Sequence, residues 1–314
     1  MKLCMIGTGY VGLVSGVCFS DLGNTVYCVD KDQNKIELLN EGTVPIYEPG
    51  LEEILKRNHK AKRLIFTTDL KKAVSNSDII FICVGTPTRK NSNSADLKYV
   101  FAVANQLKKI ISKYKIIITK STVPVTTGDK IENILSKLKN KKLVDVVSNP
   151  EFLREGDAIR DFIYPDRVII GTDSKRANKI LRSLYLPIIK KTSRYFNTSR
   201  RGAEMIKYAS NAFLATKISY INELANLCEK TGVDIKDVSF GMGSDERIGE
   251  RFLRAGPAYG GSCFPKDTRA LIDTANRFKI DLSIVKKVVK SNENRKLLLT
   301  NKIIKILNKN LKNK

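Results

Sequence analysis

The sequence predicts an α/β fold, in which a doubly wound parallel sheet is followed by an all-α central domain. Three observations predict it. Short apolar segments of strand length alternate with helical segments over the first half of the 314-residue chain. Most strand-like segments are followed by Gly, Pro, Thr or Asn, which is typical of a parallel sheet with crossover helices. From about Ser199 onward, apolar residues recur at helical spacing instead.

The chain opens with the elements of a dinucleotide-binding, Rossmann-like fold. A buried strand is predicted over Lys2–Ile6, a glycine loop over Gly7–Gly12 and a helix over Leu13–Leu22. The next strand, Thr25–Asp30, ends in an acid. A Gly-x-Gly-x-x-Gly loop in this context predicts a dinucleotide site, although a glycine turn in an unrelated α/β protein is the alternative.

The glycine loop and the acid predict which dinucleotide binds. Gly7 permits a tight turn, Gly9 lets the backbone approach a pyrophosphate, and Gly12 allows the helix to pack closely. The amides at the helix N-terminus then donate to the anion. Asp30 would accept hydrogen bonds from the ribose hydroxyls and repel a 2′-phosphate, which favours NAD over NADP, while Lys31 weakens this discrimination.

Later strands are predicted over Ile79–Val84, Ile116–Thr119, Val144–Val147 and Arg167–Gly171. Ligand-binding residues of such sheets lie at the carboxyl ends of the strands. We therefore expect Thr86 and Thr122 to face the cofactor. Glu151 and Glu155 follow the third of these strands, where the alternative is that they only cap a helix.

The second half predicts a helical domain. One long helix is expected over Ser199–Lys230, and the other helices are expected over Ile235–Gly241, Asp245–Arg254, Lys266–Arg277 and Leu282–Leu311. We therefore predict an NAD-binding domain at 1–198, a central dimerisation and catalytic domain at 199–295, and a connector end with a basic tail at 296–314.

Cys263 is the cysteine whose surroundings indicate chemistry. The other five of the six cysteines are expected to be small buried hydrophobes. Cys263 follows a glycine-rich segment at the predicted start of a helix, where the helix N-terminus and Lys266 favour a thiolate. Asp267 lies four residues later, one turn along the same helix face.

A second pair at helical spacing is Lys207 and Asn211. Lys207 would lie on or beside the apolar stripe of the long helix, where a charge needs a partner. The alternative is a surface lysine whose stem covers apolar side chains.

The composition and charge of the chain limit the kinds of partner that it is expected to bind. Lysine and arginine number 56 against 32 acids, a net charge of +24, but these residues are spread along the chain, which favours a solvated surface. Nucleic-acid binding is the minor alternative, because no recognition motif accompanies the charge. We expect no metal site, no signal segment and no membrane span, and therefore a cytoplasmic protein. His59 is the only histidine.

Six motifs in order give a resemblance to the UDP-glucose/GDP-mannose dehydrogenase family, and to its UDP-glucose branch in particular. They are Gly-Thr-Gly-Tyr-Val-Gly-Leu at 7–13, Pro-Ile-Tyr-Glu-Pro-Gly-Leu at 45–51, Val-Gly-Thr-Pro-Thr at 84–88, Ser-Thr-Val-Pro-Val at 121–125, Asn-Pro-Glu-Phe-Leu-Arg-Glu-Gly at 149–156 and Gly-Gly-Ser-Cys-Phe-Pro-Lys-Asp at 260–267. The resemblance implies NAD-dependent, four-electron oxidation of UDP-glucose to UDP-glucuronate through a thiohemiacetal and a thioester on Cys263.

The resemblance also implies the roles of individual residues. The catalytic set is Cys263, Lys207, Asn211, Asp267, Glu151 and Thr122. The cofactor set is Gly7, Gly9, Tyr10, Val11, Gly12, Asp30, Lys35, Thr86, Thr122, Glu155 and Lys266. The substrate set is Glu151, Phe152, Leu153, Arg154, Glu155, Lys207, Asn211, Arg254, Tyr259 and Gly260, with Arg247 supplied by the second subunit of a homodimer.

Family members carry a further carboxy-terminal α/β domain that covers the uridine, and the chain ends at Lys314, where that domain would begin. The resemblance therefore leaves the activity of this chain alone open. The alternatives to an active UDP-glucose enzyme are a truncated, non-catalytic NAD-binding homodimer and an enzyme of the GDP-mannose type.

Overall fold

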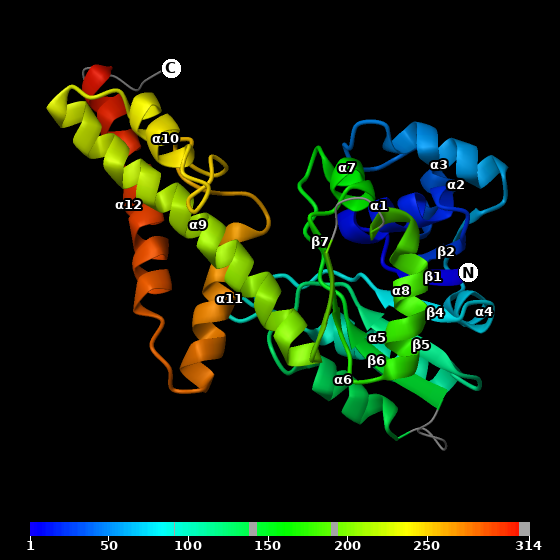
Figure 1. Ribbon diagram of the computed structural model, residues 1–314. Helices are drawn as coiled ribbons and strands as arrows, with labels where there is room; N and C mark the ends of the chain where they lie inside the picture. The colour runs from blue at the N-terminus through cyan, green and yellow to red at the C-terminus, as the bar shows by residue number, and fades with distance from the viewer. Residues whose placement is uncertain (91, 138–142, 190–193, 308–314) are drawn as a thin grey trace. The chain divides into compact units, whose positions relative to one another are not determined.

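The chain folds into two compact units in a computed structural model, which describes residues 1–90, 92–137, 143–189 and 194–307. Unit 1 comprises Met1–Pro87 and Asp96–Lys207, and unit 2 comprises Thr88–Ala95 and Tyr208–Lys314. The division falls inside one long helix, α9 (Arg200–Thr231), so both units contain part of it (Figure 1). The domain limits predicted from the sequence stay predictions.

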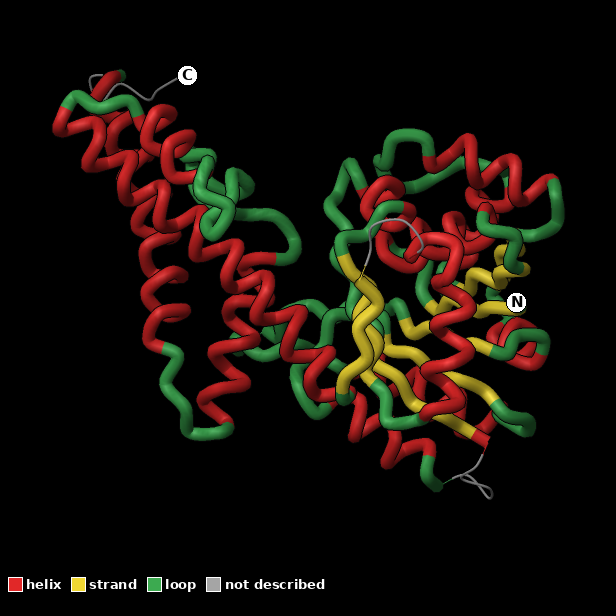
Figure 2. The backbone as a smooth tube through the Cα atoms, viewed as in Figure 1, coloured by secondary structure: helices red, strands yellow, loops and turns green. Residues whose placement is uncertain are grey.

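Unit 1 is built on one eight-stranded sheet with the order β3-β2-β1-β4-β5-β6-β7-β8. Figure 2 shows the strands in yellow. The strands are β1 (Lys2–Ile6), β2 (Thr25–Val29), β3 (Leu64–Thr67), β4 (Ile79–Ile82), β5 (Lys115–Thr119), β6 (Val144–Ser148), β7 (Arg167–Gly171) and β8 (Arg194–Thr198). The order reverses between β1 and β4, which is where doubly wound sheets bind ligands. The predicted fold class is confirmed for this unit.

Two features of the sheet differ from the prediction. The sheet is not wholly parallel, because β7 meets β6 in antiparallel register at Gly171 and Ser148, while β7 and β8 are parallel. Strands β3 and β8 were not predicted. The first contains three successive apolar residues, Leu64, Ile65 and Phe66, and is as long as β4, so its signal was present but overlooked. The second is a polar edge strand without a buried residue and lacks the apolar run of a central strand.

Helices cover the sheet of unit 1 on two sides. They are α1 (Tyr10–Asp21), α2 (Gln33–Asn40), α3 (Leu51–Lys60), α4 (Leu70–Ser75), α5 (Lys98–Ile110), α6 (Thr127–Leu135), α7 (Ala158–Ile163) and α8 (Lys175–Ile189). Helices α1, α3, α7 and α8 share one apolar core with the sheet. Phe19 of α1 lies at its centre, with ring centroids 4.9 Å from Phe162 and 5.4 Å from Tyr185. Helix α5 packs against α4 and α6 as a separate group.

Unit 2 is helical, as predicted. Its helices over the described residues are the later part of α9, α10 (Ile235–Gly243), α11 (Phe264–Arg277) and α12 (Ser283–Ile306). Tyr208 and Ala212 of α9 pack on Ala270 and Leu271 of α11, and Ala215 packs with Tyr259 and Val288. Predicted helical residues after Leu307 lie outside the described residues, as does the end of the basic tail.

The helix predicted over Asp245–Arg254 is wrong, since this segment consists of turns and loop. Gly249 and Phe252 have φ angles of 72° and 67°, which a right-handed helix does not allow. The segment also folds back on the end of α10, because a Cβ added to Gly243 would lie 2.9 Å from Glu250 Cα. Over the described residues, no helix is both long and apolar enough to cross a membrane.

Candidate functional site

The glycine loop between β1 and α1 leaves no room for side chains at two positions. Gly7 has a φ of 101°, and a Cβ added to it would lie 2.9 Å from Cys83 O. A Cβ added to Gly12 would lie 1.9 Å from Gly7 O. At Gly9, an added Cβ would meet nothing within 4 Å, and α1 begins after it without a side-chain cap. The start of α1 thus has open space at Gly9 and no side-chain cap, which suits a pyrophosphate.

Asp30 lies directly after β2 and is held toward this loop. Its Oδ2 accepts hydrogen bonds from Thr8 N at 2.9 Å and Thr8 Oγ1 at 2.8 Å, and Lys35 Nζ lies 3.4 Å away. Burial acts to raise the pKa of the Asp30 carboxyl, but the bonds from Thr8 and Asp32 N, together with Lys35, hold this pKa below its ordinary value. Asp30 is therefore a carboxylate at neutral pH, as ribose recognition requires.

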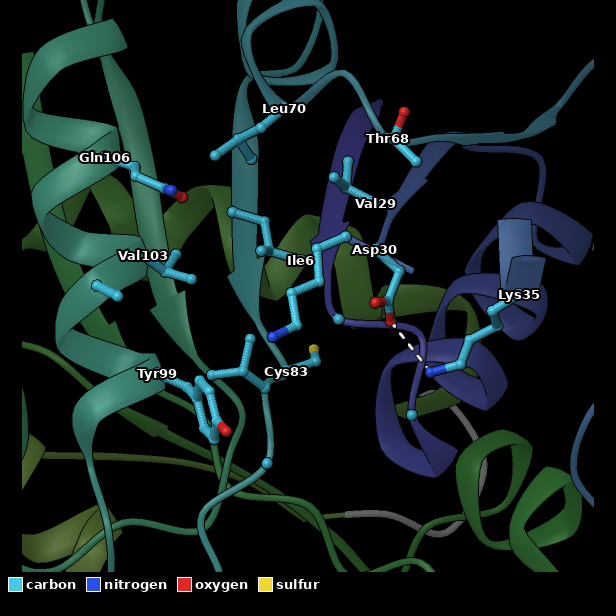
Figure 3. Close-up of a pocket in the computed structure, with 16 residues that line it drawn as sticks. Ile6, Val29, Asp30, Lys35, Thr68, Leu70, Cys83, Tyr99, Val103 and Gln106 are labelled. Atoms are coloured by element: carbon cyan, nitrogen blue, oxygen red, sulfur yellow. Dashed lines mark hydrogen bonds and ion pairs between the residues drawn. The ribbon is translucent and has the colours of Figure 1, made fainter. Parts of the chain in front are cut away.

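A cavity of about 570 Å³ lies beside the loop, within unit 1. Figure 3 shows Asp30 and Lys35 on one side, Tyr99, Val103 and Gln106 of α5 on the other, and Cys83 between them. Gly7, Gly9 and Lys31 also line it. The size is within the range of small-molecule sites, and a tight glycine turn, an uncapped helix start and an ionised acid meet at its wall. These residues fit NAD.

A buried ion pair joins α9 to the loop after β6. The Lys207 Nζ is 3.0 Å from the Glu151 Oε1, and the side chains are 6% and 7% exposed. Lys207 also lies 5.2 Å from the centroid of the Phe152 ring. The alternative of a surface lysine is thereby wrong, and so is the alternative that Glu151 caps a helix, because α7 begins only at Ala158.

The Glu151 carboxyl is held in its charged form. Burial acts to raise the pKa of the Glu151 carboxyl, but the charge of Lys207, the Leu153 amide at 2.7 Å and the more distant Lys120 together lower it below its ordinary value. Lys120 is 4% exposed and bonds Asn149 Oδ1 at 3.3 Å, and burial lowers its pKa. Two lysines and one carboxylate thus make a buried polar group at the carboxyl ends of β5 and β6.

Cys263 stands apart from the other cysteines, as expected. It is exposed, whereas Cys4, Cys18, Cys28, Cys83 and Cys228 are buried. Burial raises the pKa of the Cys18 and Cys83 thiols to about 12, so they are inert at neutral pH. Cys263 is the N-cap residue of α11, and its Sγ lies 3.5 Å from Ser262 Oγ.

Asp267 lies one turn along α11 from Cys263 and is 1% exposed. Its Oδ2 accepts a hydrogen bond from Asn211 Nδ2 of α9 at 2.6 Å, and its Oδ1 contacts the Lys266 ammonium. Unit 2 therefore brings Asn211 and Asp267 together, one turn along α11 from the exposed Cys263. Lys207 of unit 1 and Asn211 of unit 2 lie on consecutive turns of the same helix.

The remaining site residues predicted in unit 1 differ in their burial and in their contacts. Thr86 is buried and donates to Thr122 O at 2.8 Å, which ties the loops after β4 and β5 together. Arg154 is held by Asp157 and Asp161 at 2.7 and 2.6 Å, and Glu155 lies in an exposed turn. Leu153 is half-buried against the core and Val11 is half-buried in α1.

The remaining site residues predicted in unit 2 are not all brought together. Tyr259 is buried, and its backbone is fixed by the Asn292 side chain at 2.8 and 3.0 Å. Gly260 is exposed beside it. Arg254 lines a cavity of about 460 Å³ with Lys236 and Phe240. Arg247 is exposed and pairs with Asp245 of its own turn.

Four residues of unit 1 have roles that sequence reasoning missed. Thr8 binds Asp30, and Glu48 accepts bonds from Gly156 N, Ala158 N and the Tyr10 hydroxyl. Tyr10, predicted to bind cofactor, thus also connects the loop of Glu48 to Gly156. Lys120 and Glu204 are buried ionisable groups beside predicted residues. The only signal for Thr8, Glu48 and Lys120 was their position within or next to a recognised motif, and Glu204 had no such signal.

The fold and the cavity of unit 1 define a dinucleotide-binding protein of the Rossmann-like class. The chain belongs to the UDP-glucose/GDP-mannose dehydrogenase family of NAD-dependent nucleotide-sugar dehydrogenases. Residues 1–189 match the model described as "UDP-glucose/GDP-mannose dehydrogenase family, NAD binding domain", and residues 201–294 match the model of the family's central domain. Family membership and NAD as cofactor, both predicted from the sequence, are confirmed.

Individual relatives support this family assignment. The chain is 52% identical over 306 residues to the UDP-glucose 6-dehydrogenase of Rhizobium meliloti, a match that covers 97% of this chain and 70% of the relative. It is 50% identical over 303 residues to that of Pseudomonas aeruginosa, covering 95% and 67%. Among solved structures, a UDP-glucose dehydrogenase from Pyrobaculum islandicum superposes with a TM-score of 0.89 at 40% identity, over 93% of this chain and 68% of that chain.

Proposed function

We propose that this chain oxidises the C6 hydroxymethyl group of UDP-glucose to a carboxylate with two NAD, and that Cys263 holds the substrate covalently between the two oxidations. The observation that carries this is the setting of Cys263. It is the exposed cysteine, it precedes α11 as its N-cap, and the buried Asp267 lies one turn along that helix, where it accepts a hydrogen bond from Asn211 of α9. The relatives of highest identity named above support UDP-glucose as the hexose, and a GDP-mannose dehydrogenase from Pseudomonas aeruginosa is similar at 36% identity.

NAD, when bound, accepts one hydride in each oxidation. In the first, the substrate hydroxyl loses its proton to a base and its C6 hydride to the cofactor, which leaves an aldehyde. Lys207 and Asn211 stabilise the negative charge that develops on the oxygen, since their donors are fixed by burial and by α9. Glu151 keeps Lys207 in place and assists the proton steps.

Cys263 then adds to the aldehyde carbon. The thiolate sulfur forms a bond to C6, the carbonyl oxygen takes up a proton, and the product is a thiohemiacetal. This species again carries a hydrogen on C6, so a second hydride can leave, with loss of the hydroxyl proton, to give a thioester. An aldehyde alone would need hydration to offer that hydride.

Water hydrolyses the thioester in the last step. Its oxygen bonds to C6, the C–S bond breaks, and the thiolate of Cys263 returns. Asp267 and Glu151 are the carboxylates we assign to orienting and deprotonating this water, with Thr122 nearby as a hydroxyl donor. The balance is one hydroxymethyl group, two NAD and one water converted to one carboxylate, two NADH and three protons.

We further propose how the nucleotide sugar is bound. Leu153, Arg154 and Phe152 contact the sugar, and Tyr259, Gly260 and Arg254 the diphosphate. Helix α9 carries exposed Phe213, Tyr220 and Leu227, which support a homodimer through this helix, and Arg247 then reaches the site of the second subunit.

The experiment mixes the purified chain with NAD and UDP-glucose and follows NADH absorbance and UDP-glucuronate. Two NADH per acid are expected from the wild type. GDP-mannose in place of UDP-glucose should give a much lower rate. An intact, NAD-binding protein that forms no NADH would overturn activity of this chain alone and favour a non-catalytic NAD-binding dimer.

A further inference from the structure

Glu204 joins three elements of unit 1 through one carboxylate oxygen. It lies in the second turn of α9 and is 3% exposed. Its Oε1 accepts hydrogen bonds from Gly128 N at 2.7 Å and from Ser148 Oγ at 3.1 Å. Gly128 belongs to the first turn of α6, and Ser148 is the last residue of β6. The start of α9 is thus fastened to both.

The contact is closely packed. A Cβ added to Gly128 would lie 3.0 Å from Glu204 Oε1 and 3.1 Å from Ser148 Oγ, so even a methyl group would disturb it. The second oxygen, Oε2, is buried and has no hydrogen-bond partner among the described residues. A carboxylate in this position is costly, because one of its two buried oxygens has no hydrogen-bond donor among the described residues.

The position of Glu204 relates it to the ion pair. Lys207 follows it by three residues on α9, and Glu151 follows Ser148 by three residues after β6. A shift of α9 along or about its axis at Glu204 therefore moves the Lys207 ammonium relative to the Glu151 carboxylate. The 3.0 Å separation of that pair depends on where the helix is fastened.

We propose that Glu204 is a positioning residue, which holds Lys207 against Glu151 for the oxidation proposed above and does so most firmly with its carboxyl group neutral. The effect of Glu204 on turnover rests on the proposed function, whereas its effect on the position of Lys207 does not.

The electrostatics of the surroundings support the neutral form. Burial raises the pKa of the Glu204 carboxyl to about 7, against the opposing effect of the hydrogen bonds from Gly128 N and Ser148 Oγ and of the Thr126 amide close by. Asp129 of α6 is a charged group nearby that raises this pKa further. Arg200 and Arg201 of α9 are also near, and their guanidinium groups are directed to Asp129, in the case of Arg200 also to Glu132. A neutral carboxyl still accepts both bonds through its carbonyl oxygen, and it removes the unsatisfied charge from Oε2.

The first test is a pH profile of three variants. Glu204→Gln keeps an acceptor oxygen and cannot ionise, whereas Glu204→Ala removes the acceptor. Relative to Glu204→Gln, the wild type should be equally active at about pH 6 and progressively less active up to about pH 8.5. Glu204→Ala should lose kcat on the order of 10-fold or more, with KM for NAD unchanged. The exposed Glu53→Gln of α3 is the control and should match the wild type.

The second test does not require turnover. Acetylation of Lys207 by a water-soluble reagent is measured by peptide mass spectrometry and normalised to exposed Lys230. Labelling of Lys207 should rise several-fold in Glu204→Ala and stay low in Glu204→Gln. Unchanged labelling in Glu204→Ala would overturn the positioning role, and a constant activity ratio across the pH range would overturn the part assigned to protonation. A wild type that cannot oxidise UDP-glucose refutes the proposed function, while the labelling result still decides this inference.

Discussion

The Lys207 ammonium lies 3.0 Å from the Glu151 carboxylate, and neither side chain is more than 7% exposed. The two residues come from α9 and from the loop after β6, more than 50 positions apart in the sequence. An ion pair this deeply buried is weak evidence for stability, because desolvation opposes the attraction. Its value lies in holding a cation and a base at fixed positions.

Removing one partner should be worse for folding than removing both. We expect Lys207→Met to lower the free energy of unfolding by about 3–5 kcal/mol, because a buried carboxylate loses its partner. The double variant Lys207→Met with Glu151→Gln should recover most of that loss, yet neither should form NADH. Urea denaturation measures the first effect, and equal stability of the single and double variants would contradict it.

The same pair makes stability depend on pH in acid. The pKa of Glu151 is lower in the folded state than its ordinary value of 4.5, so its contribution is present above that pH and is lost as pH falls below it. The wild type should therefore lose stability more steeply below about pH 4.5 than the Lys207→Met, Glu151→Gln double variant. Denaturation curves at a series of pH values test this, and identical slopes would count against a depressed pKa.

Cofactor binding should fail when the glycine loop is filled. Gly12→Ala would place a methyl group 1.9 Å from Gly7 O, so we expect loss of NAD binding or of stability. Gly241→Ala is the control, because an added Cβ there meets nothing within 4 Å and the backbone needs no positive φ. Calorimetric titration with NAD compares the two, and normal binding by Gly12→Ala would contradict this geometry.

Asp267 should matter for turnover more than for folding. Asp267→Asn keeps an oxygen that can accept from Asn211 and removes the charge, so we expect kcat to fall on the order of 100-fold while the protein remains folded. Asp273→Asn on the same helix is the matched control, since it only breaks a surface pair with Arg277. A similar kcat for both variants would exclude a catalytic role for Asp267.

Local patterns predicted much of the fold. The apolar runs of β1, β4 and β5 and the long repeat of α9 are visible within a few residues of their bounds. The segment after Asp245 was mistaken for a helix, since its charged residues are compatible with one and only backbone angles at Gly249 and Phe252 exclude it. The polar edge strand β8 has no apolar signal of its own.

The sequence predicted parts of the candidate site, but not how those parts contact one another. The spacing of Lys207 and Asn211, and that of Cys263 and Asp267, predicted which residues share a helix face. The spacing did not show that Asn211 would bond Asp267, or that Lys207 would find Glu151, because these contacts arise from packing of distant segments. Glu204 was missed for the same reason, since a buried acid inside a helix has no local pattern.

The covalent role of Cys263 can be tested by trapping. Glu151→Gln should slow hydrolysis, so that protein given NAD and UDP-glucose carries a UDP-glucuronyl thioester on the peptide that contains Cys263, as detected by mass spectrometry. Cys263→Ser in the same background should carry no adduct and form no UDP-glucuronate. An adduct on another residue, or acid formed with two NADH by Cys263→Ser, would contradict the account.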